Sequence, residues 1–282
     1  MDGDTLDVPL PTGANVSVTS LLTSRTTIGS TSDGTSTPTS TSTSTSTSTS
    51  TSRPSIKITS SQSEEYQHRL ADVCSRATVN DQLNVIFQQD KTGDSTHVTA
   101  DLLYPAAKAR VEKKVKAGAS VVEAANFAAV VCWEPPEATA QTTLSETELQ
   151  DLAVERPIFA SFIRQMQEVR IRTLGRDQAY WNMSLMARDP ERKDKGAVRA
   201  VIEPYVARAR REGVPIWLCA GNERARDVYE YLGFRTVGIT WSYPVEKVEG
   251  DGQVGLPTWC MVCNWPVEQL ERNKMVVMEG HA

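Results

Sequence analysis

Asn222-Glu-Arg-Ala-Arg-Asp-Val-Tyr-Glu-Tyr-Leu-Gly-Phe234 follows a short apolar run at 214–219 and precedes an alternating run at 235–241. These segments, with Gly as a helix stop, predict a strand, a short helix and another strand. Asn222, Ala225 and Tyr229 stand at offsets of 0, 3 and 7, close to one face of that helix. We therefore expect chemically active side chains on this face.

The composition divides the chain into unequal parts. Residues 1–63 contain almost nothing that could form a core, and residues 35–52 are a near-perfect Thr-Ser alternation. Such a segment has too little apolar surface to offset the entropy cost of ordering it. We expect a disordered Ser/Thr-rich tail at 1–55, one folded domain at 56–270 and a C-terminal tail at 271–282.

Charge and hydropathy exclude several classes of protein. The net charge is −5, so the chain has no general basic field for nucleic acid. No run approaches the ~18 apolar residues that span a bilayer, and the N-terminus lacks the basic cluster and apolar core of a secretory signal. We expect an intracellular, cytoplasmic protein without nucleic-acid or membrane partners. The sequence leaves the oligomeric state open.

The five cysteines predict reduced thiols. Cys260 and Cys263 form a lone Cys-x-x-Cys within a strand-like run, and residues three apart on a strand point to opposite faces. The second half of a zinc site is absent, and the histidines are distant in sequence. We therefore expect no metal.

Hydrophobic periodicity predicts an alternation of strands and helices. The expected strands are 56–59, 120–124, 126–133, 180–187, 214–219, 235–241 and 259–265. The expected helices are 64–77, a short one beginning near 85, 102–117, 159–174, 198–211 and the one after Asn222, with polar loops at 137–150 and 247–255. This order predicts a mixed α/β sheet, parallel where a helix separates two strands and antiparallel at hairpins.

A charged loop follows the strand at 180–187 and contains one glycine, Gly196, just before the next helix. The exposed N–H groups and the dipole at a helix start favour an anion such as a pyrophosphate. Lys193, Lys195 and Arg199 add positive charge. A solvated basic loop is the alternative interpretation, because one glycine is a weak phosphate signature.

The two motifs occur in one order and spacing: Asp189-Pro190, Gly196, Glu203-Pro204, Gly213, Asn222, Tyr229 and Gly233-Phe234. This pattern resembles the GCN5-related N-acetyltransferase superfamily, particularly its fungal members, over roughly 56–265. The resemblance implies the acyl-CoA N-acyltransferase fold, a mixed and mostly antiparallel sheet with a central, splayed parallel strand pair flanked by helices.

The resemblance also implies a function. Acetyl-CoA would be the co-substrate, and a small-molecule amine would accept the acetyl group, with fungal secondary metabolism as one setting. Tyr229 would protonate the leaving thiolate, and Glu134 is a candidate to take the proton of the amine. A tyrosine or a carboxylate with only a structural role is the alternative for each. The residues implied to bind the co-substrate are Leu185, Met186, Ala187, Arg188, Lys193, Lys195, Gly196, Ala197, Val198 and Asn222.

The loop departs from the family pattern Gln/Arg-x-x-Gly-x-Gly/Ala. Lys193 takes the first position and Val198 the last, where a β-branched side chain crowds the backbone. Asp194 brings negative charge to the same loop, and Arg188 stands where the family is usually apolar. These departures keep two alternatives open: a binding or regulatory module without catalysis, and an O-acyltransferase, although no histidine is well placed to act as its base.

Overall fold

A computed structural model describes residues 56–93, 97–139, 143–244 and 255–266. The predicted tails at 1–55 and 271–282, and most of the predicted loop at 247–255, lie outside the described residues. Among the described residues, no helix combines the length and apolarity that a bilayer span requires.

The described chain alternates between strands and helices. The strands are β1 (Ile58–Ser61), β2 (Ser120–Ala124), β3 (Ala129–Glu134), β4 (Trp181–Arg188), β5 (Ile216–Ala220), β6 (Arg235–Ser242) and β7 (Leu256–Cys263). The helices are α1 (Glu64–Ala77), α2 (Gln82–Thr92), α3 (Ala100–Lys116), α4 (Pro136–Thr139), α5 (Glu146–Glu155), α6 (Pro157–Leu174), α7 (Ala197–Glu212) and α8 (Glu223–Tyr231).

Most predicted elements are confirmed to within a few residues, and α1 matches its predicted bounds. The main difference is at the β2–β3 hairpin, where β3 begins at Ala129 instead of 126. Ala125, Asn126 and Phe127 have φ of 55°, 54° and 65°, so they form a left-handed turn that cannot belong to a strand. The segment read as a polar loop at 137–150 holds α4 and the first turn of α5.

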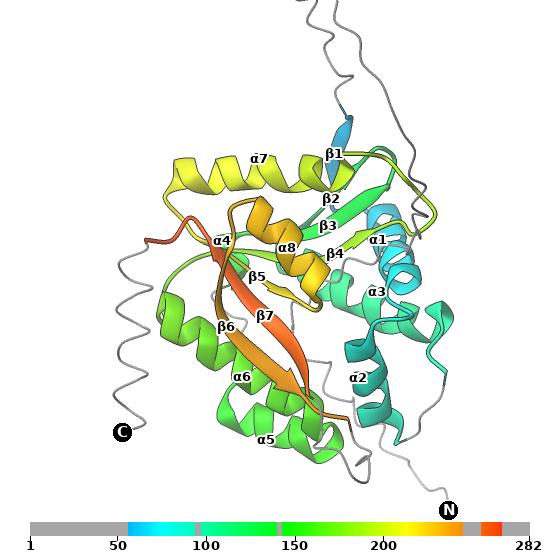
Figure 1. Ribbon diagram of the computed structural model, residues 1–282, viewed down its shortest axis with the longest axis vertical. Helices are drawn as coiled ribbons and strands as arrows, with labels where there is room; N and C mark the ends of the chain where they lie inside the picture. The colour runs from blue at the N-terminus through cyan, green and yellow to red at the C-terminus, as the bar shows by residue number, and fades with distance from the viewer. Residues whose placement is uncertain (1–55, 94–96, 140–142, 245–254, 267–282) are drawn as a thin grey trace, which may run out of the picture.

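The seven strands form one sheet in the order β1-β2-β3-β4-β5-β7-β6 (Figure 1). Within it only β4 and β5 pair in parallel, and each of the other neighbouring pairs is antiparallel. The predicted mixed, mostly antiparallel sheet with a central parallel pair is therefore confirmed. Strand β7 lies between β5 and β6, so the final strand completes the sheet beside the parallel pair.

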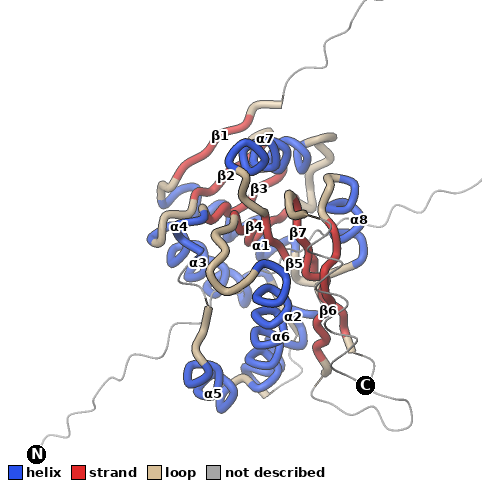
Figure 2. The backbone as a smooth tube through the Cα atoms, turned by 90° about the vertical axis from the view of Figure 1, so that its left-hand side faces the viewer, coloured by secondary structure: helices blue, strands red, loops and turns tan. Residues whose placement is uncertain are grey.

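Helices pack against both faces of this sheet (Figures 1 and 2). On one face, α7 and α8 bury Val201 and Tyr229 against strand residues such as Met183 and Leu218. On the other face, α1 and α3 cover β2 to β4, while α2, α5 and α6 cover β5 and β7. The parallel pair therefore lies at the centre of the molecule, with helices above and below it.

Candidate functional site

Strands β4 and β5 are paired only at their beginnings. The paired residues are Trp181 with Ile216 and Asn182 with Trp217. Beyond them, β4 continues beside β3 as far as Arg188, and β5 continues beside β7. The carboxyl halves of the two parallel strands thus diverge, and among the described residues β4 and β5 share no pairing beyond Asn182 and Trp217. An extended ligand with amide groups can add to the edge of a strand as another strand would.

A β-bulge interrupts β4 beside this divergence. Ala187 pairs with Val130 and Ser184 pairs with Cys132, so β4 has one more residue than β3 over this interval. Leu185 lies in the bulge with φ of 47°, an unusual conformation for a bulky side chain. A bulge re-aims backbone groups near a functional site. It lies within 185–187, the segment that the resemblance implies to bind the co-substrate.

Asn222 begins α8 as its N-cap. Its Oδ1 accepts the N–H of Ala225 at 2.9 Å, which satisfies one of the donors left open at a helix start. In the described part of the chain, no residue accepts a hydrogen bond from its Nδ2. The cap therefore fixes the side chain while leaving a donor for a ligand carbonyl.

Tyr229 lies on the face of α8 that packs on the sheet. Its side chain is fully buried, in one cluster with Met186 of β4 and Leu218 of β5. Its ring meets that of Phe234 edge-on, with centroids 5.9 Å apart. Tyr229 is thus in the core beside the two strands that diverge. Gly233, with φ of 92°, ends the helix and lets the chain return to the sheet at Phe234.

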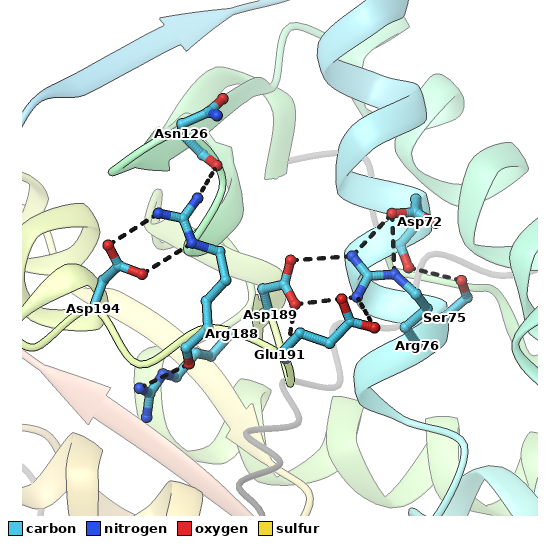
Figure 3. Close-up of polar contacts among 9 residues, drawn as sticks. Asp72, Ser75, Arg76, Asn126, Arg188, Asp189, Glu191 and Asp194 are labelled. Carbon is cyan, nitrogen blue, oxygen red and sulfur yellow. Dashed lines mark hydrogen bonds and ion pairs between the residues drawn. The ribbon is translucent and has the colours of Figure 1, made fainter.

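The loop after β4 is anchored by Arg76 of α1 (Figure 3). Its guanidinium binds both carboxylate oxygens of Asp189 at 3.1 Å and also contacts Asp72. Burial raises the pKa of Asp189, but hydrogen bonds from Arg76 and from the N–H of Glu191 outweigh it and leave the pKa below its ordinary value. The ion pair holds the end of β4 against α1.

Arg192 neutralises the negative charge that the sequence placed in this loop. It binds both carboxylate oxygens of Asp194 at 2.9 and 3.0 Å, and it donates to the carbonyl of Asn126 at 2.7 Å. Arg188 donates to the carbonyl of Arg192 and so supports the same loop. Asp194 and Arg188, two of the four departures from the family pattern, therefore take part in one network that shapes the loop.

The amino end of α7 fits an anion. Gly196 is its N-cap with φ of 87°, and no side chain caps the helix. The first N–H groups of a helix are open donors, and the dipole adds positive character. Lys193 and Lys195 are exposed in the preceding turn. Ala197 is buried, and Val198 packs in part against the core between α7 and the sheet.

Glu134, the candidate base, is buried at the end of β3. Its Oε1 accepts hydrogen bonds from Nζ of Lys114 at 2.6 Å and from Nδ2 of Asn182 at 2.7 Å. The exposed fractions of the Lys114 and Glu134 side chains are 0% and 2%. The residue therefore has a structural partner that the sequence did not indicate, and its role as a base stays a prediction.

A cavity of about 470 Å³ lies at the start of α8. Three segments far apart in sequence form its walls: the α1–α2 turn, the β5–α8 turn and the start of β7. Its lining residues are Asn80, Asp81, Gln82, Leu83, Gly221, Asn222, Glu223, Arg224, Leu256, Pro257 and Trp259. Of these, only Asn222 was a site residue predicted from sequence, because the fold alone brings the other two segments to it.

The Cys-x-x-Cys cysteines belong to opposite faces of the sheet. Cys260 packs with the α6 side, where its Sγ lies 3.8 Å from that of Cys219, and Cys263 packs with the α7 side. Among the described residues, no group of three or more His, Cys, Asp or Glu side chains is arranged to hold a metal ion.

No protein-family model matches the chain. Among curated proteins, it is similar to "Putative increased recombination centers protein 11" of Saccharomyces cerevisiae, with 33% identity over 81 residues. That match covers 28% of this chain, and the chain spans half the length of the curated relative.

Three solved structures illustrate the similarity in three dimensions. A mutant agmatine N-acetyltransferase has a TM-score of 0.48 at 16% identity, covering 73% of this chain and 98% of that one. Arylalkylamine N-acetyltransferase 2 of Aedes aegypti has a TM-score of 0.49 at 13% identity, covering 73% of this chain and 97% of that one. A polyamine N-acetyltransferase of Drosophila melanogaster has a TM-score of 0.45 at 15% identity, covering 73% of this chain and 99% of that one.

Proposed function

We propose that this chain is a GCN5-related N-acetyltransferase that moves the acetyl group of acetyl-CoA to the amine of a small molecule. The observation that carries the proposal is the divergence of β4 and β5 after two paired positions. Three further features support the proposal: a bulge in β4, a helix start suited to anions at α7, and the α8 face with Asn222 and Tyr229. The folded domain proposed from sequence, 56–270, would carry the whole site.

The chain's residues would hold acetyl-CoA along its length. The edge of β4 beyond Asn182 would pair with the amides of the pantetheine arm, and Nδ2 of Asn222 would donate to one of its carbonyls. The N–H groups that follow Gly196 would bind the pyrophosphate, with Lys193 and Lys195 as exposed cations nearby. The Arg192–Asp194 pair leaves the loop without an unpaired carboxylate at residue 194.

The same residues account for the chemistry of transfer. A neutral amine attacks the thioester carbon, and negative charge develops on the carbonyl oxygen. Backbone N–H groups within 185–187 would stabilise this oxyanion. As the C–N bond forms and the C–S bond breaks, Tyr229 would give its hydroxyl proton to the thiolate. Ordinary pKa values of ~8.5 for a thiol and ~10 for a tyrosine make this transfer inexpensive.

Removing the hydroxyl of Tyr229 tests this role. In Tyr229→Phe, transfer of acetyl from acetyl-CoA to a primary amine should fall by about 10²-fold or more, the usual contribution of an acid–base group. Acetyl-CoA binding, measured by calorimetry, should stay within about twofold, since the ring remains.

Tyr205→Phe is the matched control, because Tyr205 is a half-buried α7 tyrosine stacked on Trp133 with ring centroids 4.4 Å apart. It should keep wild-type turnover. Equal turnover in wild type and Tyr229→Phe would remove Tyr229 from the mechanism, and binding without turnover in wild type would support the non-catalytic module instead.

A further inference from the structure

Asp81 is a mostly buried carboxylate in the wall of the cavity that also contains Asn222. It lies in the α1–α2 turn and is the N-cap of α2, with its Oδ1 accepting the N–H of Leu83 at 2.9 Å. The helix start therefore holds this carboxylate in one orientation. A carboxylate can accept several hydrogen bonds, so capping and binding of an ammonium are compatible.

The charged groups around this cavity point to Asp81 as the group that meets the acceptor. The other ionisable side chains of the lining, Glu223 and Arg224, are both exposed in the first turn of α8, whereas Asp81 is 7% exposed. Opposite charges interact more strongly where water is excluded. A cationic amine entering the cavity is therefore attracted most strongly to Asp81.

The remaining walls suit an amine on an apolar carbon skeleton. Leu83, Leu256, Pro257 and Trp259 supply aliphatic and aromatic surface. The guanidinium of Arg226 lies over the Trp259 ring, with its central carbon 5.1 Å from the ring centroid. Mostly apolar walls with a few placed polar groups are typical of small-molecule sites.

We propose that Asp81 binds the ammonium of the acceptor in this cavity and takes its proton as general base. This inference rests on the proposed function. The first proton passes from the ammonium to Asp81 and then to water through the cavity. The neutral amine then forms the C–N bond, and Tyr229 gives its hydroxyl proton to the thiolate. The second proton of the amine passes through water to Tyr229 and restores its hydroxyl. The net products are the amide, free CoA thiol and one proton.

The test separates this role from capping. Asp81→Asn keeps an oxygen for the Leu83 N–H but cannot bind an ammonium by charge or accept its proton. Primary amines from 2-phenylethylamine to putrescine serve as probes, and the best wild-type substrate is used throughout. We expect kcat/KM to fall by at least about 10²-fold in Asp81→Asn. Calorimetry should show weaker binding of the amine and unchanged binding of acetyl-CoA.

Asp90→Asn is the matched control. Asp90 is also mostly buried, and its carboxylate accepts the N–H groups of Ile158 and Phe159 at 3.0 and 2.9 Å, but it does not line the cavity. It should leave kcat/KM unchanged.

The loss of kcat/KM in Asp81→Asn should also become smaller as the pH approaches the pKa of the amine, because the solution then supplies neutral amine. If a folded Asp81→Asn variant kept wild-type kinetics and wild-type amine affinity, this inference would be overturned and the proposed function would stand. Absence of transfer by wild type to every amine would overturn the proposed function, and this inference with it.

Discussion

Replacing Lys114 by Met should destabilise the protein strongly, because it leaves the carboxylate of Glu134 buried without its cation. The two side chains are 0% and 2% exposed, and Nζ lies 2.6 Å from Oε1. After the replacement, the carboxylate keeps the hydrogen bond from Nδ2 of Asn182 at 2.7 Å. Breaking one partner of such a buried pair costs about 3–5 kcal/mol. For a domain of this size, that is a drop in Tm of about 6–20 °C.

The assay is urea unfolding followed by tryptophan fluorescence, with Lys114→Met, Glu134→Gln and the double variant compared with wild type. Gln at 134 can still accept from Asn182, and the double variant has no buried charge at this position. We therefore expect the double variant to recover most of the stability lost in Lys114→Met. A loss below about 1 kcal/mol in Lys114→Met, or losses in the double variant that equal the sum of the single ones, would refute this reasoning.

The double variant also decides the role of Glu134. If the folded protein without this carboxylate keeps wild-type acetyl transfer, Glu134 is structural and not a base. If turnover is lost while stability is restored, the base role predicted for Glu134 gains support over the one proposed for Asp81.

Three further predictions concern packing, pH and thiol reactivity. Gly238→Ala should lower the free energy of unfolding by about 1–3 kcal/mol, because its Cβ would lie 2.5 Å from Cγ1 of Val169. Adding Val169→Ala to this variant should restore part of the lost stability, as chemical unfolding would show. The pKa of Asp189 is lowered by Arg76, so their stabilisation is present above the ordinary carboxyl pKa and is lost as pH falls through the folded pKa. The Tm difference between wild type and Arg76→Gln should therefore narrow from pH 6 to pH 3, and a constant difference would contradict the pairing. Burial raises the pKa of Cys132 to about 12, so iodoacetamide at pH 8 should label it only after unfolding, as mass spectrometry would show.

Local signals in the sequence predict the elements that carry the candidate site. The short helix after Asn222, the glycine that ends it and the strands on either side are all confirmed. They succeed because glycine ends and hydrophobic periodicity act over a few residues. The mixed sheet also follows from the order of elements, since a helix between two strands favours a parallel pair.

Other features of the site depend on contacts between distant segments. The bulge at Leu185 arises from register against β3, and nothing in the letters of 181–188 indicates an extra residue. Arg192 offsets Asp194, and Lys114 pairs with Glu134, because the fold brings them together. Asp81 reaches the cavity for the same reason, since its turn is joined to α8 only in three dimensions. Pairing across long separations leaves no periodic trace in one sequence.

Calorimetric titration with acetyl-CoA tests the central claim most directly. Wild type should bind with a Kd within about 1 μM to 1 mM, the range usual for enzyme substrates. Gly196→Asp should weaken binding by at least about tenfold, because it places a carboxylate at the helix start proposed to hold the pyrophosphate. Gly213→Asp is the control: Gly213 also has positive φ, at the other end of α7, with no atom within 4 Å of an added Cβ. It should bind like wild type. No binding by wild type at millimolar acetyl-CoA, or equal binding by Gly196→Asp, would contradict the proposed site.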